Sequence, residues 1–319
     1  MAAIPIVLGS AYQAVTDALR EELGPDATVR DFDAARSLAD QLRDVTVLIL
    51  GSFVVSRQII DAAPRLRLVH QHGRGLDSVD MAAASARGVL AANVPARNSV
   101  SVAEHALALL LTLAKRFHLC DRAIAERTLG APTGLELAGK TLGIVGLGAS
   151  GSELARIALA LGMRVVAVRA RPTEPVALPI EVHGPKELHR VLTASDFISL
   201  HAPLNDATRG MIGRDELRLM KRTTYLINIA RAALVDYDAL CDALHNRTIA
   251  GAATDVFWKE PADPSDPILK LENFVLTPHV AGFSDASIRQ VVEVIADNIR
   301  RLVRGEALSH VANPSALQV

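Results

Sequence analysis

The chain has 319 residues, of which 50% are hydrophobic and only 3% aromatic, and its formal net charge is −1 at pH 7. This length is too great for one ordinary hydrophobic core and suits two domains of about 100–200 residues each. The near-neutral charge argues against a nucleic-acid-binding protein, because such proteins usually carry a clustered basic excess. An apolar content made of Ala, Val, Leu and Ile is typical of helices packed on a buried parallel sheet.

The first hundred residues alternate short apolar segments with helical patterns, which predicts an open parallel sheet. Strands are expected at Ile4–Leu8, Thr28–Phe32, Val45–Leu50, Leu68–His72 and Val89–Asn93, with helices at Ala11–Leu23, Ala34–Arg43, Ser56–Ala63 and Ser78–Arg87 between them. A long helix is expected over Ser99–Leu119, followed by a loop at Thr128–Gly134.

A second alternating series starts at Lys140. Strands are predicted at Thr141–Val145, Arg164–Arg169, Phe197–His201, Thr224–Asn228, Ala250–Asp255 and Phe274–Leu276, and helices at Ser152–Leu161 and Ile288–Val303. We therefore predict an α/β fold with two Rossmann-like, doubly wound parallel-sheet domains and a cleft between them. Residues 1–99 plus 290–319 would form one domain, to which the last helix returns, and residues 100–289 the other.

The N-terminus lacks the basic and long apolar regions of a signal peptide, and the longest apolar stretch is too short to span a membrane. Cys120 and Cys241 have no nearby Cys or His at metal-ligand spacing, so we interpret them as reduced, buried thiols. We expect a cytoplasmic protein without a metal site and without nucleic-acid or membrane partners.

Residues Thr141–Gly151 read T-L-G-I-V-G-L-G-A-S-G, a strand followed by G-x-G-x-x-G and a helix. Gly146 permits the tight turn, Gly148 lets a pyrophosphate approach the backbone, and Gly151 lets helix and strand pack closely. The helix start at Ala149 and Ser150 offers N–H groups and a positive dipole end to phosphates. The alternative is a Gly-rich turn without a ligand, but the strand–turn–helix context favours a dinucleotide.

The end of the second strand lacks the acid that usually binds the adenine ribose hydroxyls of NAD. Arg169 and Arg171 are found there instead. Guanidinium groups bind the 2′-phosphate of NADP through charge-assisted hydrogen bonds, whereas a carboxylate would repel it. We therefore predict NADP as the cofactor; the alternative is two solvated arginines and NAD held by other contacts.

Three segments after predicted strands carry candidate catalytic residues: N-I-A-R ends at Arg231, D-V-F-W-K-E-P contains Glu260, and T-P-H-V-A-G contains His279. Hydride transfer to a 2-oxo acid needs a cation for the carboxylate, polarisation of the carbonyl and a proton for the nascent alkoxide. The planar guanidinium of Arg231 suits the first two tasks. His279 suits the third, because histidine exchanges protons near neutral pH, and Glu260 can orient the ring and stabilise the imidazolium.

These motifs, in this order and together with Gly73–Asp80 and Val102–His105, resemble the D-isomer-specific 2-hydroxyacid dehydrogenases, which include phosphoglycerate dehydrogenase and glyoxylate/hydroxypyruvate reductase. The resemblance covers nearly the whole chain. It implies Arg231, Glu260 and His279 as the catalytic set, with His279 as the acid/base. It also implies further cofactor-binding residues: Ile229, Ala230, Asp255 and Gly282 at the nicotinamide side, and His201, Pro203 and Thr208 along the adenosine and nicotinamide ribose.

The resemblance also makes residues 1–99 plus 290–319 a flavodoxin-like substrate-binding domain and residues 100–289 the dinucleotide-binding domain. The substrate carboxylate would lie against the loop that holds Arg74 and Gly75, with Asn98 near the domain junction, and a homodimer would form largely on the long helix after Asn98. Arg74 replaces a residue that is often small. We hypothesise that it adds a cation for a second anionic or polyhydroxy group, the alternative being a solvent-facing arginine.

Some features depart from the family or leave two interpretations. Ala232 follows Arg231 where the family usually has Gly, and we expect little effect. The chain ends soon after the last predicted helix, so we expect no regulatory domain. Trp258 either lines the pocket or packs under the Glu260 loop. Asp77 and Asp80 are interpreted as helix caps rather than metal ligands.

The sequence as a whole predicts an oxidoreductase that uses NADP(H) on a small, D-isomer 2-hydroxy or 2-oxo acid similar to glyoxylate or hydroxypyruvate. One alternative is an NAD enzyme like phosphoglycerate dehydrogenase. Another is a dinucleotide-sensing binding protein, as in dehydrogenase-like transcriptional corepressors. The joint presence of Arg231, Glu260 and His279 argues against a purely binding role.

Overall fold

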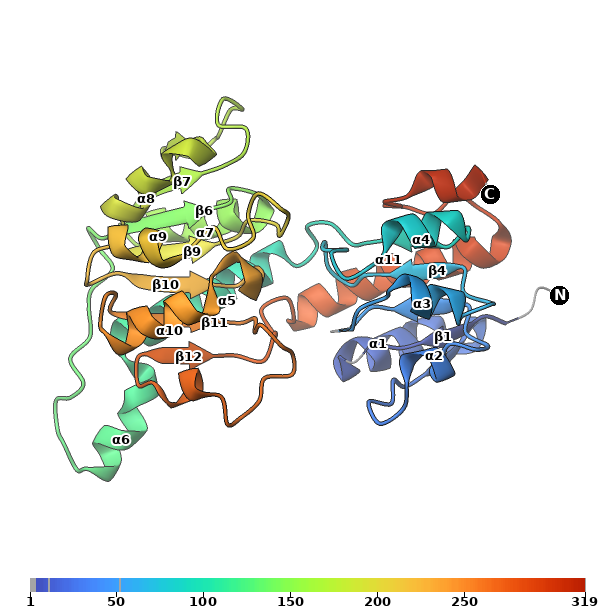
Figure 1. The fold of residues 1–319 in the computed structure, drawn as a ribbon, viewed down its shortest axis with the longest axis horizontal. Coiled ribbons are helices and arrows are strands. Elements are labelled where there is room, and N and C mark those ends of the chain that lie inside the picture. The colour runs from blue at the N-terminus through green and yellow to red at the C-terminus, as the bar shows by residue number, and fades with distance from the viewer. Residues whose placement is uncertain (1–3, 11, 52, 319) are drawn as a thin grey trace. The chain divides into compact units, whose positions relative to one another are not determined.

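The structure is a computed structural model and describes residues 4–10, 12–51 and 53–318. The described residues form two compact units. The first unit comprises those within Met1–Asn98 and Phe283–Val319, and the second unit is Ser99–Gly282. Each unit has a parallel sheet with helices on both faces (Figure 1). The α/β class with two doubly wound parallel sheets is therefore confirmed.

The described part of the first unit contains a five-stranded sheet in the order β2-β1-β3-β4-β5, which is the flavodoxin-like order. Its strands are β1 (Ile6–Leu8), β2 (Thr28–Arg30), β3 (Val47–Ile49), β4 (Leu68–His70) and β5 (Leu90–Ala92). Helices α1 (Gln13–Leu23) and α11 (Asp285–Arg304) share a core on one face, and α2 (Leu38–Gln41), α3 (Arg57–Asp61) and α4 (Met81–Ala86) cover the other. Short 3₁₀ turns lie at Gly24–Asp26 and Pro314–Gln318.

Helix α11 belongs to the first unit although it follows the second in the chain. Its apolar stripe, which includes Val291 and Ile295, packs in the same core as α1. On this helix Asn298 is fully buried, and its amide Nδ2 lies 2.9 Å from Nε2 of the buried His70 on β4. The His70 Nδ1 atom is 3.0 Å from the Gln71 carbonyl oxygen, so Nδ1 donates and Nε2 accepts. Burial lowers the pKa of His70 to about 4, so the ring is neutral near pH 7.

The described part of the second unit contains a seven-stranded parallel sheet in the order β12-β11-β10-β9-β6-β7-β8. Its strands are β6 (Thr141–Val145), β7 (Arg164–Val168), β8 (Glu181–His183), β9 (Phe197–Leu200), β10 (Tyr225–Asn228), β11 (Gly251–Thr254) and β12 (Phe274–Leu276). This is a Rossmann arrangement, and the strand order reverses between β6 and β9, where doubly wound sheets bind their ligands.

Two layers of helices enclose this sheet. Helices α5 (Ser99–Lys115) and α7 (Ala149–Ala160) pack on one face, and α8 (Leu188–Ala194), α9 (Arg214–Leu219) and α10 (Tyr237–His245) on the other. Helix α6 (Cys120–Ala125) lies on an arm, the segment between α5 and β6 (residues 116–140), which projects away from the sheet (Figure 1). Short 3₁₀ turns lie at Phe117–Leu119, Pro185–Glu187, Ala232–Leu234 and Pro267–Lys270.

Several elements differ from the prediction. The helix predicted at Ala34–Arg43 is only α2, because the Gln41 side chain folds back and bonds both the amide and the carbonyl of Asp33. The long helix ends at Lys115 rather than Leu119, because Arg116 adopts a left-handed conformation with φ 57°. Cys120 and Cys241, which we predicted to be buried, are both partly exposed. Ala11, the predicted start of the first helix, lies outside the described residues.

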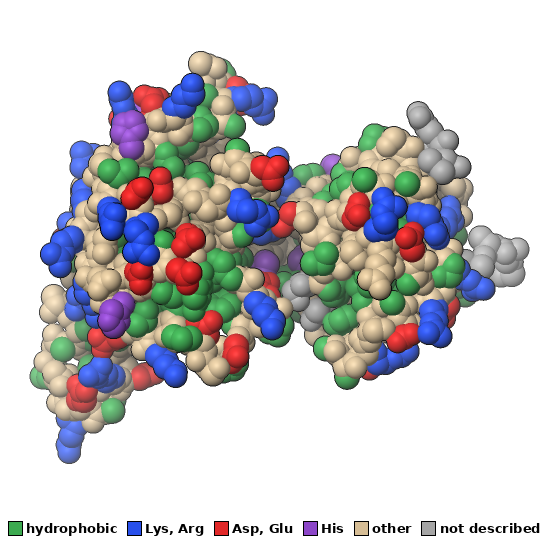
Figure 2. All heavy atoms as spheres, in the orientation of Figure 1, with side chains coloured by type: hydrophobic (Ala, Val, Ile, Leu, Met, Phe, Trp, Pro, Cys, Tyr) green, Lys and Arg blue, Asp and Glu red, His purple; other side chains and the backbone are tan. Residues whose placement is uncertain are grey.

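The surface carries both signs of charge. On the face drawn in Figure 2, Lys and Arg side chains are interspersed with Asp and Glu, in keeping with the near-zero net charge. Within residues 4–10, 12–51 and 53–318 we find no helix with the length and hydropathy that crossing a bilayer requires.

Candidate active site

The predicted site residues of the second unit follow the carboxyl ends of its strands. Gly146 follows β6, Arg169 follows β7, His201 follows β9, Arg231 follows β10, Asp255 follows β11 and His279 follows β12. Because all of these strands are parallel, their carboxyl ends lie along one edge of the sheet. The polar groups after them are thereby gathered at the edge where open α/β sheets bind ligands.

The glycine loop has the shape that a dinucleotide requires. Gly146 has φ 104°, and a Cβ atom there would lie 2.5 Å from the Ala202 backbone nitrogen, so only glycine fits. A Cβ on Gly151 would lie 2.4 Å from the Gly146 oxygen, so helix α7 approaches the loop closely. Gly148, by contrast, faces open space, with no heavy atom within 4 Å of a built Cβ. The twelve-residue helix α7 begins directly after it. These residues fit a pyrophosphate at the helix N-terminus.

His201 joins the loop after β9 to the glycine loop. Its Nδ1 atom lies 3.0 Å from Ser150 Oγ, and its Nε2 atom lies 3.0 Å from Ser199 Oγ. Burial lowers the pKa of His201 to about 3, so the ring is neutral and donates one of these bonds while accepting the other. In the same segment, the Thr208 hydroxyl donates to the Pro203 carbonyl at 2.7 Å. The residues expected along the ribose thus lie in one segment after β9, and its first residue, His201, contacts the start of α7.

The two arginines after β7 share an acidic partner. The guanidinium of Arg169 pairs with Oε2 of Glu174, and Nη1 of Arg171 lies 2.7 Å from Oε1 of the same carboxylate. The side chain of Arg169 is 16% exposed and that of Arg171 is 80% exposed. Sequence reasoning did not single out Glu174. Its signal is an opposite charge five residues after Arg169, between two prolines.

Asn228 shapes the turn that presents Arg231. Its Oδ1 accepts from the Ala230 amide at 3.1 Å, and its Nδ2 donates to the Arg231 carbonyl at 2.9 Å. The Asn228 side chain is buried at the end of β10, so these bonds fix the backbone after Ile229. The Arg231 guanidinium donates through Nη1 to the Ala230 carbonyl at 2.9 Å, which folds the end of the side chain back onto its own turn.

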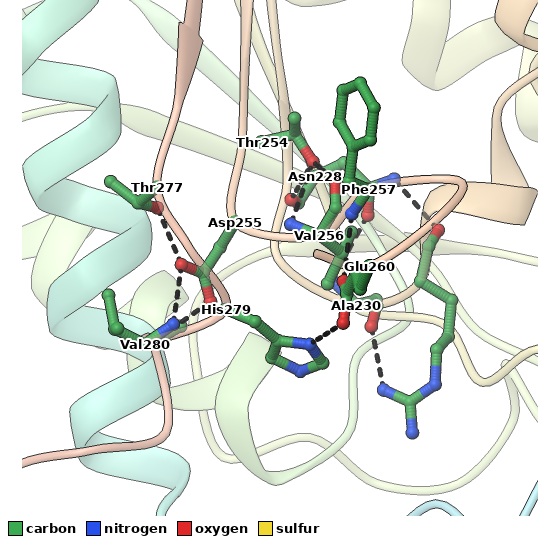
Figure 3. A network of polar contacts seen from close by, with 12 residues as sticks. Asn228, Ala230, Thr254, Asp255, Val256, Phe257, Glu260, Thr277, His279 and Val280 are labelled. Atoms are coloured by element: carbon green, nitrogen blue, oxygen red, sulfur yellow. Dashed lines mark hydrogen bonds and ion pairs between the residues drawn. The ribbon is translucent and has the colours of Figure 1, made fainter. Parts of the chain in front are cut away.

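Asp255 fastens the turn that carries His279 (Figure 3). It is 1% exposed, and its Oδ1 accepts from Thr277 Oγ1 at 2.6 Å and from the Val280 amide at 2.9 Å. Its Oδ2 accepts from the Ala281 amide at 2.7 Å. The turn has an uncommon conformation, because His279 has φ 57°. The carboxylate therefore binds two backbone amides just after this left-handed residue and the side-chain hydroxyl of Thr277 just before it.

His105 on α5 completes this cluster. Its Nε2 lies 2.9 Å from Thr277 Oγ1 and 3.4 Å from Asp255 Oδ1. Burial alone would raise the pKa of the Asp255 carboxyl. The hydrogen bonds from His105, Thr277 and the two backbone amides outweigh burial and hold that pKa below its ordinary value. Asp255 is therefore ionised at neutral pH.

Glu260 and His279 form an ion-pair-like contact (Figure 3). Oε2 of Glu260 lies 2.8 Å from Nδ1 of His279, and Oε1 accepts from the Phe257 amide at 3.0 Å. Burial would raise the pKa of Glu260, but the bond and charge of His279, the Phe257 amide and the charge of Arg231 together lower it. The ionised carboxylate accepts a hydrogen bond, so Nδ1 of His279 carries a proton and donates it to this bond. Since Arg231 is near enough for its charge to act on the Glu260 carboxyl, the three predicted catalytic side chains lie in one cluster.

Trp258 packs beneath the Glu260 loop. Its Nε1 donates to the Val235 carbonyl at 2.9 Å, and its ring meets those of Tyr237 and Phe257 edge-on at centroid distances of 5.0 and 5.5 Å. Ala232, which follows the catalytic arginine candidate, is buried at the start of a 3₁₀ turn. Both side chains are part of the support of the loops rather than of their exposed edge.

The predicted substrate-binding residues Arg74, Gly75 and Asn98 belong to the first unit. Arg74 is exposed, and its carbonyl accepts from Asn93 Nδ2 at 2.8 Å, while the Gly75 carbonyl accepts from Gln71 Nε2 at 2.9 Å. Their part in substrate binding stays a prediction. Asp80, which we interpreted as a cap, accepts from the Ala83 amide at 2.8 Å at the start of α4.

Among the described residues, no group of three or more His, Cys, Asp and Glu side chains is placed to hold a metal ion. The polar clusters after the strands are instead pairs and chains of hydrogen bonds among Asp255, Thr277, His105, Glu260 and His279.

Comparison with known proteins identifies the family. Residues 107–281 match the family described as D-isomer specific 2-hydroxyacid dehydrogenase, NAD binding domain. The chain is 37% identical to a protein named glyoxylate reductase from Korarchaeum cryptofilum, over 88% of this chain and 87% of that protein. It is 34% identical to a protein named D-3-phosphoglycerate dehydrogenase from Methanocaldococcus jannaschii over 86% of this chain, and it spans only 53% of that relative.

A solved structure shares the fold throughout. It is described as an NADPH-dependent glyoxylate/hydroxypyruvate reductase from Sinorhizobium meliloti in complex with NADP and malonate. The similarity covers 98% of both chains with a TM-score of 0.83 and 29% sequence identity. The chain therefore belongs to the D-isomer-specific 2-hydroxyacid dehydrogenases, NAD- or NADP-dependent oxidoreductases that act on small 2-hydroxy and 2-oxo acids.

Proposed function

We propose that the chain prefers NADPH and reduces a small 2-oxo acid, such as glyoxylate or hydroxypyruvate, to the D-2-hydroxy acid. The observation that carries this proposal is the Glu260–His279 pair at 2.8 Å, under the charge of Arg231, at the carboxyl edge of a Rossmann sheet. The relatives named glyoxylate reductase and glyoxylate/hydroxypyruvate reductase support the substrate class.

The three side chains have complementary tasks in this reaction. The Arg231 guanidinium binds the substrate carboxylate and polarises the carbonyl, because its planar fork matches these oxygens. His279 donates a proton from Nε2 to the nascent alkoxide, and in the opposite direction it accepts that proton. Glu260 keeps the proton on Nδ1 and stabilises the imidazolium, since it is ionised and bonded to that atom. The nicotinamide, when bound, supplies the hydride.

The cofactor-binding residues divide by the part of the dinucleotide they would hold. Gly146, Gly148, Ala149, Ser150 and Gly151 would hold the pyrophosphate, His201, Pro203 and Thr208 the ribose, and Ile229, Ala230, Asp255 and Gly282 the nicotinamide side. Asp255 also holds the turn of His279. If Asp255 both binds the nicotinamide side and holds the His279 turn, it would link the position of the cofactor to that of the proton donor.

The preference for NADPH rests on Arg169 and Arg171, which follow β7 where NAD-binding folds usually carry an acid. Arg169 is largely buried, so its guanidinium is held in place and would meet a 2′-phosphate with little loss of side-chain entropy. In the first unit, Arg74, Gly75 and Asn98 would bind the substrate, with Arg74 adding a cation for a second polar group.

The test is the oxidation of NADPH and of NADH at about 340 nm, the reduced-nicotinamide band, with glyoxylate and with hydroxypyruvate. We expect kcat/KM with NADPH to exceed that with NADH by at least about tenfold, the value of one charge-assisted contact of about 1.4 kcal/mol. Turnover with NADH alone would overturn the NADPH preference. The absence of turnover with both acids would overturn the substrate class.

We also propose a homodimer built on the long helix α5 and the arm after it. Phe117, Ile124 and Leu129 on that arm are 61%, 74% and 101% exposed, which is unusual for large apolar side chains that stand close together in sequence. Sedimentation should give twice the chain mass of 34.0 kDa. Ile124→Asp should shift the protein toward monomer, and the control Val54→Asp, at another exposed apolar side chain, should not. A monomeric wild-type protein would contradict this proposal.

A further inference from the structure

The loop after β7 holds a carboxylate between its two arginines. One oxygen of Glu174 pairs with Arg169 and the other with Arg171. The Arg169 side chain is 16% exposed, so its ion pair with Glu174 is shielded, whereas the contact of the 80% exposed Arg171 is a surface contact. Charge-assisted bonds of a shielded guanidinium are stronger than those of a solvated one.

The backbone presents Glu174 in this position. The Glu174 amide donates to the Arg171 carbonyl at 3.3 Å, which closes a turn over four residues. Pro172 lies at the second position of this turn, where its fixed φ favours the conformation. The base of the loop is held as well, because the Arg169 amide donates to the His183 carbonyl on the neighbouring strand β8 at 3.1 Å. Both arginines and the carboxylate thus lie on a short, braced loop.

The charges of this loop decide what it binds. Two guanidinium groups and one carboxylate leave one net positive charge. A 2′-phosphate carries close to two negative charges at neutral pH and needs the same guanidinium N–H groups that Glu174 occupies. The 2′-hydroxyl of an unphosphorylated dinucleotide carries no charge and makes no such demand.

We propose that Glu174 sets the coenzyme discrimination of this protein by competing with the 2′-phosphate for Arg169 and Arg171. Its carboxylate lowers the affinity for the phosphorylated dinucleotide and leaves the affinity for the unphosphorylated one nearly unchanged. This inference rests on the proposed function, in which the two arginines receive the 2′-phosphate. Glu174 is thus a specificity-determining residue and takes no part in the hydride transfer itself.

A purely structural role for Glu174 predicts the opposite result. If the carboxylate only held Arg169 in place, its removal would free the guanidinium and weaken phosphate binding. The competing role predicts tighter phosphate binding after removal, because both guanidinium groups then have N–H donors to offer. The sign of the change in affinity therefore separates the two roles.

The experiment uses calorimetric titration of the full chain with two probes, adenosine 2′,5′-bisphosphate and 5′-AMP. In Glu174→Gln we expect the Kd for the bisphosphate to fall about tenfold at low salt, while the Kd for 5′-AMP stays within about twofold. Glu174→Ala should give the same result and guards against a new bond from the glutamine amide. The gain should shrink as salt rises, because the added attraction is between charges.

The control is Asp242→Asn, which removes the same charge from another arginine pair of the second unit. Nη2 of Arg214 lies 2.6 Å from Asp242, and both side chains are about half exposed. We expect it to change neither Kd by more than about twofold, since exposed ion pairs such as this one, between helices α9 and α10, are screened by solvent and salt. A similar gain in this control would assign the effect to net charge and overturn the role of Glu174.

Two further outcomes separate this inference from the proposed function. If wild-type protein binds 5′-AMP more tightly than the bisphosphate and Glu174→Gln reverses that order, the NADPH preference fails and the role of Glu174 stands. If wild-type protein prefers the bisphosphate and the variants bind it equally or more weakly, the NADPH preference stands and the role of Glu174 is overturned.

Discussion

Replacing Asp255 by asparagine changes the charge of a buried group while keeping its shape. The carboxylate is 1% exposed and accepts hydrogen bonds on both oxygens: Thr277 and the Val280 amide on one, the Ala281 amide on the other. Asparagine has a single side-chain oxygen. In either orientation its NH₂ group faces a backbone N–H, so at least one buried donor loses its acceptor.

The magnitude follows from these contacts. A hydrogen bond to a charged group contributes about 1.5–3 kcal/mol, and a buried donor left without an acceptor costs about 1–3 kcal/mol. We therefore expect Asp255→Asn to lower the free energy of unfolding by about 3–5 kcal/mol. The same bonds hold the left-handed backbone of His279, which by itself is unfavourable by about 1–2 kcal/mol for a residue with a Cβ. Once they weaken, the turn relaxes and kcat falls as well, by about tenfold or more.

The assay is urea unfolding followed by circular dichroism, with kcat measured on the same preparations. The matched control is Asp236→Asn, because Asp236 is exposed and caps α10 by accepting from the Ala239 amide at 2.8 Å. Asparagine caps helices as well as aspartate, so the control should lose less than about 0.5 kcal/mol. If Asp255→Asn lost no more than the control, the account of the His279 turn would be refuted.

Three further predictions concern other parts of the chain. Arg231→Lys keeps the charge but loses the planar fork, so kcat/KM for glyoxylate should fall about 100-fold. The Kd of NADPH, measured by fluorescence, should stay within about twofold. A loss of kcat/KM below tenfold would contradict bidentate binding of the substrate. Arg169→Ala should raise the Kd of NADPH more than Arg171→Ala does, because the two side chains are 16% and 80% exposed, and equal effects would argue against a held guanidinium. Burial lowers the pKa of His70 from 6.5 to about 4. As the pH falls below 6.5, His70 is therefore protonated in the unfolded chain but stays neutral in the folded chain until about pH 4. The free energy of unfolding should therefore fall by up to about 3 kcal/mol as the pH drops through this window. His70→Gln should reduce the dependence of this free energy on pH by up to about 1.4 kcal/mol per pH unit. An equal pH dependence of both proteins in urea titrations would contradict the neutral, buried ring.

The strands with strong boundary signals could be predicted from the sequence. Thr141–Val145 and Phe274–Leu276 have the predicted ends, because the glycine loop and a Thr-Pro pair stop the apolar runs. Strand β8 and helices α8 and α9 were not predicted. The three residues of β8 include Glu181 and His183 and carry no apolar run, and the short α9 is mostly charged. Both depend on neighbouring elements that periodicity does not report.

The clustering of Arg231, Glu260 and His279 could also be predicted, because each follows a strand of one parallel sheet and such strand ends lie along one edge. The support of the cluster could not. The hydrogen bonds of Asp255 depend on the direction of the Val280 and Ala281 backbone amides. That direction follows from the left-handed conformation of His279, which the sequence does not signal. The pairing of Glu174 with two arginines likewise depends on a turn in a loop without periodicity.

The measurement that tests the central claim most directly is the turnover of NADPH with glyoxylate by wild-type protein and by His279→Gln, with His245→Gln, an exposed histidine on α10, as the control. If His279 transfers the proton, the variant should lose about 10²–10⁴-fold in kcat, bind NADPH with an unchanged Kd, and differ from a fully active control. A His279→Gln protein that kept more than about a tenth of the wild-type kcat would contradict the assignment of the proton transfer to this residue.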